Sequence, residues 1–184
     1  MHYDHPSALT RAAHNLGLAT WFGGTVFGQL ALNPTVQRIT SKEERGRVLN
    51  ESWGRYNALN TVALAATTLT WRFGGLKEDA ERDPENRTLA ALKDLSLGGA
   101  LTTAITTGLL GAKIAKQAGG GATPVESGTH PAPETPVEAA RAQRLIGVFG
   151  ASSIALLSVV ISASAALENR AGRDGGGVLS RLFS

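Results

Sequence analysis

The sequence contains no cysteine in its 184 residues. This absence excludes a disulfide framework, a thiolate nucleophile and every cysteine-based zinc or iron–sulfur site. The sequence also contains no Walker phosphate loop, no G-x-G-x-x-G and no G-x-S-x-G. Nucleotide binding and serine-type hydrolysis therefore have no support in its motifs, and we predict no enzymatic activity.

Charge is also missing, from four long stretches, although the whole chain has 18 Lys and Arg against 15 Asp and Glu. The uncharged stretches cover residues 12–37, 56–71, 95–112 and 145–167. A membrane helix needs about 20 apolar residues, so the first, third and fourth stretches have suitable lengths. The second is short, but Trp53, Tyr56 and Trp71 flank it, and Trp and Tyr favour membrane interfaces.

A water-soluble four-helix bundle is the main alternative, and its helices would show Lys and Glu every three or four residues along one stripe. The four stretches show no such stripe. We therefore predict an all-α fold, a polytopic integral membrane protein with a four-helix transmembrane bundle. Residues 1–184 then form a single membrane domain with spans at about 12–35, 55–73, 93–114 and 144–168.

Local signals place the helix starts and the connections. Ser41-x-x-Glu44 has capping-box spacing and predicts a helix that starts near Ser41 and runs into the second span. Asp83-Pro84 predicts the next start, with Asp as N-cap and Pro in the first turn. The Gly- and Pro-rich segment 117–136 predicts a flexible loop, and 172–184 a flexible tail.

The side of the membrane on which the termini lie cannot be read from Lys and Arg counts, because the two sides tie. An even number of spans places both termini on one side. The Ala-, Gly- and Arg-rich usage indicates a bacterial inner (plasma) membrane.

Small residues recur at four-residue spacing within the spans. This spacing lets helix backbones approach closely in lipid, either within one bundle or between copies of the chain in a homo-oligomer. The residues expected in helix packing are Gly24, Gly28, Ala104, Gly108, Ala112, Gly147 and Ala151.

Histidines supply the metal or cofactor candidates. His14 lies at the start of the first span, and imidazole is a common ligand of transition metals and haem. The alternative is a histidine hydrogen-bonded to a neighbouring group. His2 and His5 near the terminal amine are weaker candidate ligands for copper or zinc.

A further set of uncharged polar residues in the spans can line a polar path or can hydrogen-bond between helices. It comprises Thr102, Thr103, Thr106, Thr107, Gln29, Asn57 and Asn60.

The segment from His14 to Trp71 resembles a family of small four-helix membrane proteins of unassigned function that includes transmembrane protein 205. The matching residues are His14, Trp21-Phe22-Gly23-Gly24-x-x-Phe27, Pro34 and Trp53-x-x-Tyr56. The opening His and Trp-x-Gly are also similar to the copper-resistance protein D family, which implies copper movement across membranes. This chain has one Met and lacks the several His and Met ligands of a copper path.

Two functional hypotheses result. The first is a non-enzymatic integral membrane protein with a structural, interaction or complex-subunit role, without a cofactor. Its expected partners are the lipid bilayer, other membrane subunits or a second copy, with no nucleic acid. The alternative is a small transporter-like or metal- or haem-binding membrane protein that uses His14, with copper or haem as the cofactor.

Overall fold

The computed structural model describes residues 6–182, and describes their side chains as far as residue 171. Within this part of the chain the backbone is helical, and the only extended pairing is an isolated bridge between Val125 and Pro131. The all-α prediction is confirmed. The elements in order are α1 (Ala8–Phe27), η1 (Gly28–Leu32), α2 (Asn33–Thr35), η2 (Val36–Arg38), α3 (Lys42–Phe73), α4 (Leu76–Glu81), η3 (Pro84–Asn86), α5 (Arg87–Ala115), η4 (Gly119–Gly121) and α6 (Val137–Leu182).

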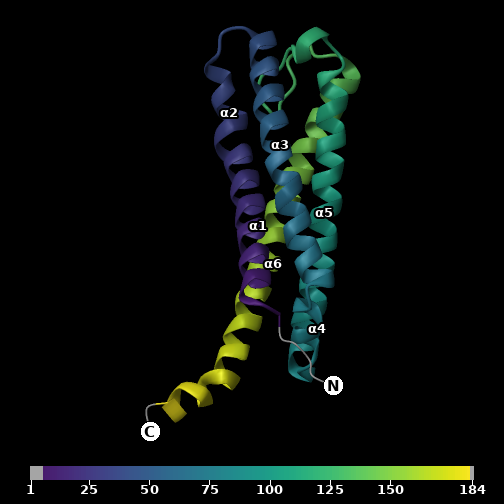
Figure 1. The fold of residues 1–184 in the computed structure, drawn as a ribbon. Coiled ribbons are helices and arrows are strands. Elements are labelled where there is room, and N and C mark those ends of the chain that lie inside the picture. Colours follow the sequence, from purple (N-terminus) through teal and green to yellow (C-terminus); the bar gives the residue numbers. More distant parts are fainter. Residues whose placement is uncertain (1–5, 183–184) are drawn as a thin grey trace.

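Four long helices, α1, α3, α5 and α6, run up and down beside one another (Figure 1). Helix α1 packs along α3, and α5 packs along α6, whereas α3 touches α5 at few points. The bundle is therefore built from two closely packed pairs. The start of α1 and the end of α6 lie at the same end of the bundle, as the even number of helices predicts.

Both predicted helix starts are confirmed. Ser41 is the N-cap of α3, and its hydroxyl accepts a hydrogen bond from the Glu44 amide at 3.2 Å. Asp83 caps the turn η3, which leads directly into α5, by accepting from the Glu85 amide at 2.9 Å. Each side chain satisfies an amide that has no partner inside its helix.

Between α1 and α2 the helical run widens into the π-helical turn η1. Pro34 lacks an amide hydrogen, so the carbonyl of Leu30 cannot receive the usual bond from four residues ahead. The Asn33 amide donates to the Gly28 carbonyl, five residues back. The first predicted span is thus one continuous helical path with a widened turn near its end.

The core contains the indole rings of Trp21 and Trp71, neither more than 1% exposed, together with aliphatic residues from α5 and α6. The tail 172–184 was expected to be flexible. Helix α6 continues through this segment to Leu182. The side chains from residue 172 onward, and residues 183–184 altogether, lie outside the described part of the chain.

Two described helical segments are long and apolar enough to cross a membrane, Pro84–Ala115 and Val137–Ala171. Helices α1 and α3 do not meet the same standard, because α1 mixes Gly, Thr and Asn with its apolar residues and α3 is charged over its first half. The four long helices of the prediction are present, but only two have the composition expected of spans.

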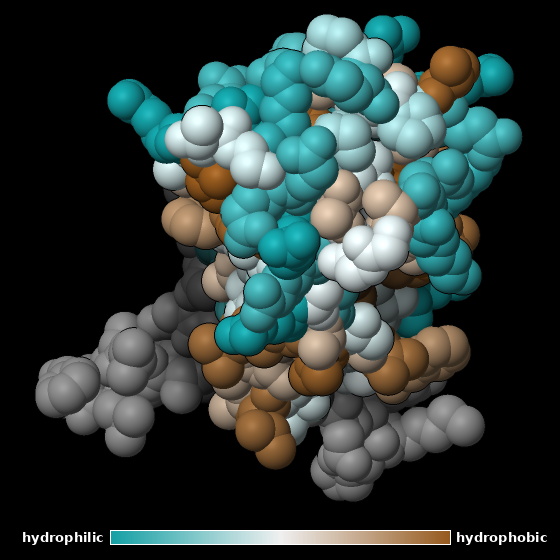
Figure 2. Space-filling view, turned by 90° about the horizontal axis from the view of Figure 1, so that it is seen from above, coloured by the Kyte–Doolittle hydropathy of each residue, from teal (hydrophilic) through white to brown (hydrophobic). Residues whose placement is uncertain are grey.

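Large apolar side chains nevertheless lie exposed on the flanks of all four helices. Figure 2 looks down on the end that carries the α1–α3 and α5–α6 connections, and shows mostly hydrophilic residues there, with hydrophobic residues at the rim. The exposed apolar residues include Leu16, Phe27, Leu59, Val62, Leu69, Leu95, Ile105, Leu109, Leu145 and Val148.

Candidate functional site

The segment 116–136, here called the cap loop, lies on one end of the bundle. Residues 117–136 were predicted to form a flexible loop, and in the structure they pack on the bundle. Thr123, Val125 and Ser127 are each at most 2% exposed, and this alternation is typical of an extended segment lying on a surface. Its backbone is bonded to the bundle, since the Val125 amide donates to the Lys42 carbonyl at 3.2 Å and the Gly128 amide to the Asn33 carbonyl at 3.0 Å.

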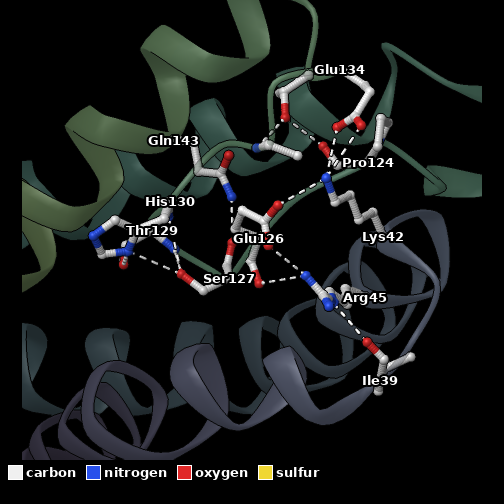
Figure 3. Close-up of polar contacts among 12 residues, drawn as sticks. Ile39, Lys42, Arg45, Pro124, Glu126, Ser127, Thr129, His130, Glu134 and Gln143 are labelled. Carbon is white, nitrogen blue, oxygen red and sulfur yellow. Dashed lines mark hydrogen bonds and ion pairs between the residues drawn. The ribbon is translucent and has the colours of Figure 1, made fainter.

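Four charged side chains hold the outer side of the cap loop (Figure 3). This loop ion cluster consists of Lys42, Arg45, Glu126 and Glu134. Lys42 Nζ lies 3.0 Å from a carboxylate oxygen of Glu126 and 3.0 Å from one of Glu134, and an Arg45 nitrogen lies 2.7 Å from Glu126. The hydrogen bond from Lys42 is the main cause that lowers the pKa of Glu126, and the same contacts raise the pKa of Lys42.

Gln143 of α6 holds the inner side of the cap loop (Figure 3). Its Nε2 donates to the Ser127 carbonyl at 2.5 Å, and the side chain is 2% exposed. The Ser127 hydroxyl in turn accepts from the His130 amide at 3.1 Å. The turn at 127–130 is therefore anchored to the bundle by a buried amide.

Beneath the cap loop is a cavity of about 290 Å³ that is lined by all four long helices. Its polar walls are made of amides and hydroxyls, and no Asp, Glu, Lys, Arg or His of the described part of the chain lines it. Trp21, Trp53 and Tyr56 supply aromatic surface. The polar lining residues are Thr25, Gln29, Asn50, Asn57, Asn60, Thr107, Thr123, Gln143 and Ser153.

Two residues that line the cavity each carry a buried polar atom without a hydrogen-bond partner among the described residues. The two atoms are Oε1 of Gln143 and Oγ of Ser153, in side chains that are 2% and 3% exposed. A buried polar atom without a partner costs about 1–3 kcal/mol, so a ligand or water that bonds to it is favoured. The sequence prediction did not include either residue, and no motif marks them.

The predicted polar path is present only in part. The hydroxyls of Thr102, Thr103, Thr106 and Thr107 donate to carbonyls of their own helix at 2.8–2.9 Å. Gln29, Asn57, Asn60 and Thr107 line the cavity, whereas the other three threonines do not.

The glycines predicted for packing in the first span, Gly24 of α1 and Gly28 of η1, receive aromatic side chains of α3. A Cβ built on Gly24 would lie 2.1 Å from Tyr56 Oη, and one on Gly28 would lie 2.1 Å from Trp53 Cη2. Trp53 is fixed in this position, because its Nε1 donates to Asn33 Oδ1 at 3.1 Å. These two glycines make room for rings from the neighbouring helix of the same chain.

The ladder on α5 has different surroundings. Ala104, Gly108 and Ala112 line the cavity, and a Cβ built on Gly108 would meet no atom within 4 Å among the described residues. On α6, Gly147 faces the cap loop, where its Cβ would lie 3.4 Å from Thr129, and Ala151 is exposed. Within the single chain Gly108 therefore makes no close helix contact, because this residue borders a cavity.

Two glycines that the spacing did not single out make the close backbone contacts. A Cβ on Gly17 would lie 2.8 Å from the Ala63 carbonyl oxygen of α3. A Cβ on Gly46 would lie 2.0 Å from the Thr123 carbonyl oxygen of the cap loop.

His14 is 2% exposed and lies between α1 and α3. Its Nδ1 is 3.0 Å from the Thr67 carbonyl oxygen and 3.0 Å from Thr70 Oγ1. A carbonyl oxygen only accepts, so Nδ1 carries a hydrogen. Nε2 has no partner among the described residues, and the adjoining cavity of about 60 Å³, which Lys93 also lines, has room for water molecules but not for a porphyrin.

The other predicted metal ligands, His2 and His5, lie outside the described residues. Among the residues that the structure describes, no group of three or more His, Cys, Asp or Glu is placed to hold a metal ion. His14 is therefore an isolated candidate ligand.

Comparison of the chain with known protein families, with curated proteins and with solved structures found no match. The resemblance of the first third of the chain to the transmembrane protein 205 and copper-resistance protein D families accordingly stays a prediction.

Proposed function

We propose that the chain is a four-helix integral membrane protein in which α1, α3, α5 and α6 all cross the bilayer. The observation that supports this most strongly is the apolar surface on the flanks of all four helices. Val62 on α3 is 66% exposed and Leu16 on α1 is 69% exposed, although neither helix has the composition of a span by itself. An extended apolar surface of this kind indicates contact with a membrane or with another protein.

The positions of the charges support the same proposal. On α5 no charge occurs between Asp94 and Lys113, and 18 residues of helix extend about 27 Å, close to the thickness of a bilayer core. At one border of this interval Asp94 accepts from Arg72 of α3 at 2.8 Å and from Lys77 at 3.0 Å. These three charged groups are thus paired at the border of the proposed span, where headgroups and water lie.

A water-soluble bundle has the opposite pattern of burial, because the core helix of a soluble protein is mostly buried. Of the most apolar 18-residue windows in the two candidate spans, only 17% and 22% of the residues are buried inside the structure. This argues for an apolar solvent around α5 and α6.

For the role of the protein we propose a non-enzymatic function, as a structural component or as a subunit of a membrane complex, in a bacterial inner membrane. The uncharged cavity supports a binding role in preference to proton or ion transfer, since those paths use buried ionisable groups. A metal-binding role for His14 is the alternative that its free Nε2 favours.

Fractionation tests the proposal. The full chain is produced in bacteria, and the membranes are washed with alkaline carbonate and then treated with detergent. An integral protein stays in the pellet after the carbonate wash and is released only by detergent. Release by carbonate or recovery in the soluble fraction would refute the proposal. Metal analysis of the purified protein and of a His14→Ala variant tests the alternative, which requires a stoichiometric metal that the variant loses.

A further inference from the structure

We propose that the cavity beneath the cap loop binds the uncharged, hydroxyl-bearing head of a glycerol lipid, such as a monoacylglycerol, whose acyl chain leaves between α3 and α5. The inference rests on the proposed membrane location. It goes beyond that proposal by assigning a ligand class to named residues.

The walls determine the charge of the ligand. Among the described residues no Asp, Glu, Lys, Arg or His lines the cavity, so a phosphate, a carboxylate or an ammonium group inside it would lose its hydration without gaining a counter-charge. The loop ion cluster does not supply one, because its four residues lie outside the lining. A neutral head is therefore favoured over the charged head of an ordinary phospholipid.

The unpartnered atoms determine the hydrogen bonds that the ligand offers. Gln143 Oε1 can only accept, and its Nε2 is already bonded to the Ser127 carbonyl, so the ligand must present a donor to this amide. Ser153 Oγ both donates and accepts. A hydroxyl group satisfies either atom, whereas a ketone or an ester carbonyl satisfies only Ser153.

The size of the cavity restricts what can be enclosed. A volume of about 290 Å³ lies at the lower limit of ligand pockets, which run from about 300 to 1,000 Å³. It encloses a small polar head but not a long acyl chain. A lipid must therefore extend out of the cavity.

The side between α3 and α5 gives the chain a way out. These helices touch at few points, and glycines of both helices line the cavity. A Cβ built on Gly54, Gly108 or Gly111, all of which line the cavity, would meet nothing within 4 Å among the described residues. Leu109, one position beyond Gly108, is 68% exposed and supplies apolar surface on α5.

The depth of the opening also fits a lipid head. Gly54 adjoins Arg55 on α3, and Ala112 adjoins Lys113 on α5, so the opening lies at the charged border of the proposed spans. The glycerol region of a bilayer lies at this border, between hydrocarbon and headgroups. A lipid in the surrounding leaflet therefore has its glycerol at the level of the cavity.

The test measures binding to the purified full chain in mild detergent by native mass spectrometry and by the shift of the melting temperature. The probes are 1-oleoylglycerol, glycerol and 1-oleoyl lysophosphatidic acid. The proposal expects one bound 1-oleoylglycerol per chain, at least tenfold weaker binding of the charged lysolipid, and no saturable binding of glycerol at the same concentrations. Equal binding of the two lipids would overturn it. Saturable binding of glycerol with no gain from the acyl chain would assign the cavity to a water-soluble polyol and would also overturn it.

Two matched pairs of variants locate the site. Gly108→Leu fills the opening, whereas Gly98→Leu on the same helix also has open space around it but lies off the cavity. We expect at least a tenfold loss of affinity for the first and none for the second. Ser153→Ala removes the unpartnered hydroxyl, and Ser164→Ala on the same helix is its control, away from the cavity.

Ser153→Ala separates a ligand site from a merely structural residue. Loss of an unpartnered hydroxyl leaves the melting temperature of the empty protein unchanged or raised, while we expect affinity for 1-oleoylglycerol to fall about three- to tenfold. Unchanged affinity in both Ser153→Ala and Gly108→Leu would refute the site. Failure of the carbonate test with retained binding would instead refute the membrane proposal alone.

Discussion

Substitution of Gly46 by Ala tests whether the cap loop is packed onto α3. The new methyl group would lie 2.0 Å from the Thr123 carbonyl oxygen and 3.0 Å from its carbonyl carbon, against 3.4 Å or more for an ordinary contact. Both contacts are with backbone, so no side-chain rotation relieves them. The cap loop must retreat by about 1 Å or more, and the Val125 amide would lose its bond to the Lys42 carbonyl.

The change in the free energy of unfolding has two destabilising contributions and one stabilising contribution. Overpacking costs about 1–3 kcal/mol. Partial exposure of Val125, which is 2% exposed in the folded protein, adds about 1 kcal/mol. The better helix propensity of Ala returns about 0.5–1 kcal/mol. We expect a net destabilisation of roughly 1–3 kcal/mol.

Gly54→Ala is the matched control, because Gly54 lies eight residues further along α3 and its Cβ would meet no atom of the described residues within 4 Å. It should be stabilised by about 0.5–1 kcal/mol through helix propensity alone. For a chain of this length 1 kcal/mol shifts the melting temperature by about 2–4 °C, so the two variants should differ by roughly 3–16 °C.

The assay is helical circular dichroism during heating in detergent, together with limited proteolysis mapped by mass spectrometry. In Gly46→Ala, cleavage between residues 116 and 136 should be faster than in the native chain, and in Gly54→Ala it should not change. Equal melting temperatures and equal cleavage in the two variants would refute the packing of the cap loop.

Two other predictions test the α1–α3 contact and the loop ion cluster. Gly28→Ala places a methyl group 2.1 Å from the fixed ring of Trp53, so it should lower the melting temperature in detergent. Gly23→Ala is the control and should not lower it, because its methyl group would meet no atom of the described residues within 4 Å. Equal melting temperatures of the two variants would contradict the contact. The lowered pKa of the two carboxylates in the cluster stabilises the docked loop above their ordinary pKa of 4.5, and this contribution is lost as the pH falls through the lowered values. The mobility of a spin label on Pro133→Cys should therefore rise only below about pH 4.5, and a pH-independent spectrum would refute the role of the cluster.

The helices could be predicted from the sequence because their signals are local. The cap of Ser41 on the Glu44 amide depends on residues three apart, and the turn at Asp83 depends on the proline that follows it. The uncharged stretches likewise gave the four long helices. Whether α1 and α3 lie in lipid depends on what surrounds them. The hydropathy of one helix does not give this information.

The surroundings of the small residues could not be predicted, because spacing does not identify the facing residue. Gly24 and Gly108 both belong to four-residue ladders, yet the first receives Tyr56 and the second borders the cavity. The register of α3 against α1, and the separation of α3 from α5, decide between these outcomes. Both are tertiary properties.

The packing of the cap loop could not be predicted, because its composition outweighed its pattern. The many Gly and Pro residues indicate disorder, but the alternating residues Thr123, Val125 and Ser127 are the buried ones. Since two of these three side chains are polar, a search for alternating hydrophobic residues does not detect this pattern. Their burial depends on hydrogen bonds, such as that from Gln143 to the Ser127 carbonyl, which no local pattern shows.

Accessibility of a cysteine at position 62 tests the central claim, membrane insertion of α3, most directly. The chain has no cysteine of its own, so each introduced thiol reports on one position. Val62 is 66% exposed in the middle of α3, and Thr40 is exposed in the connection before it. In native membranes opened to both sides, the account predicts that Thr40→Cys reacts with a charged maleimide and that Val62→Cys reacts only after denaturation. Equal labelling of the two thiols before denaturation would contradict it.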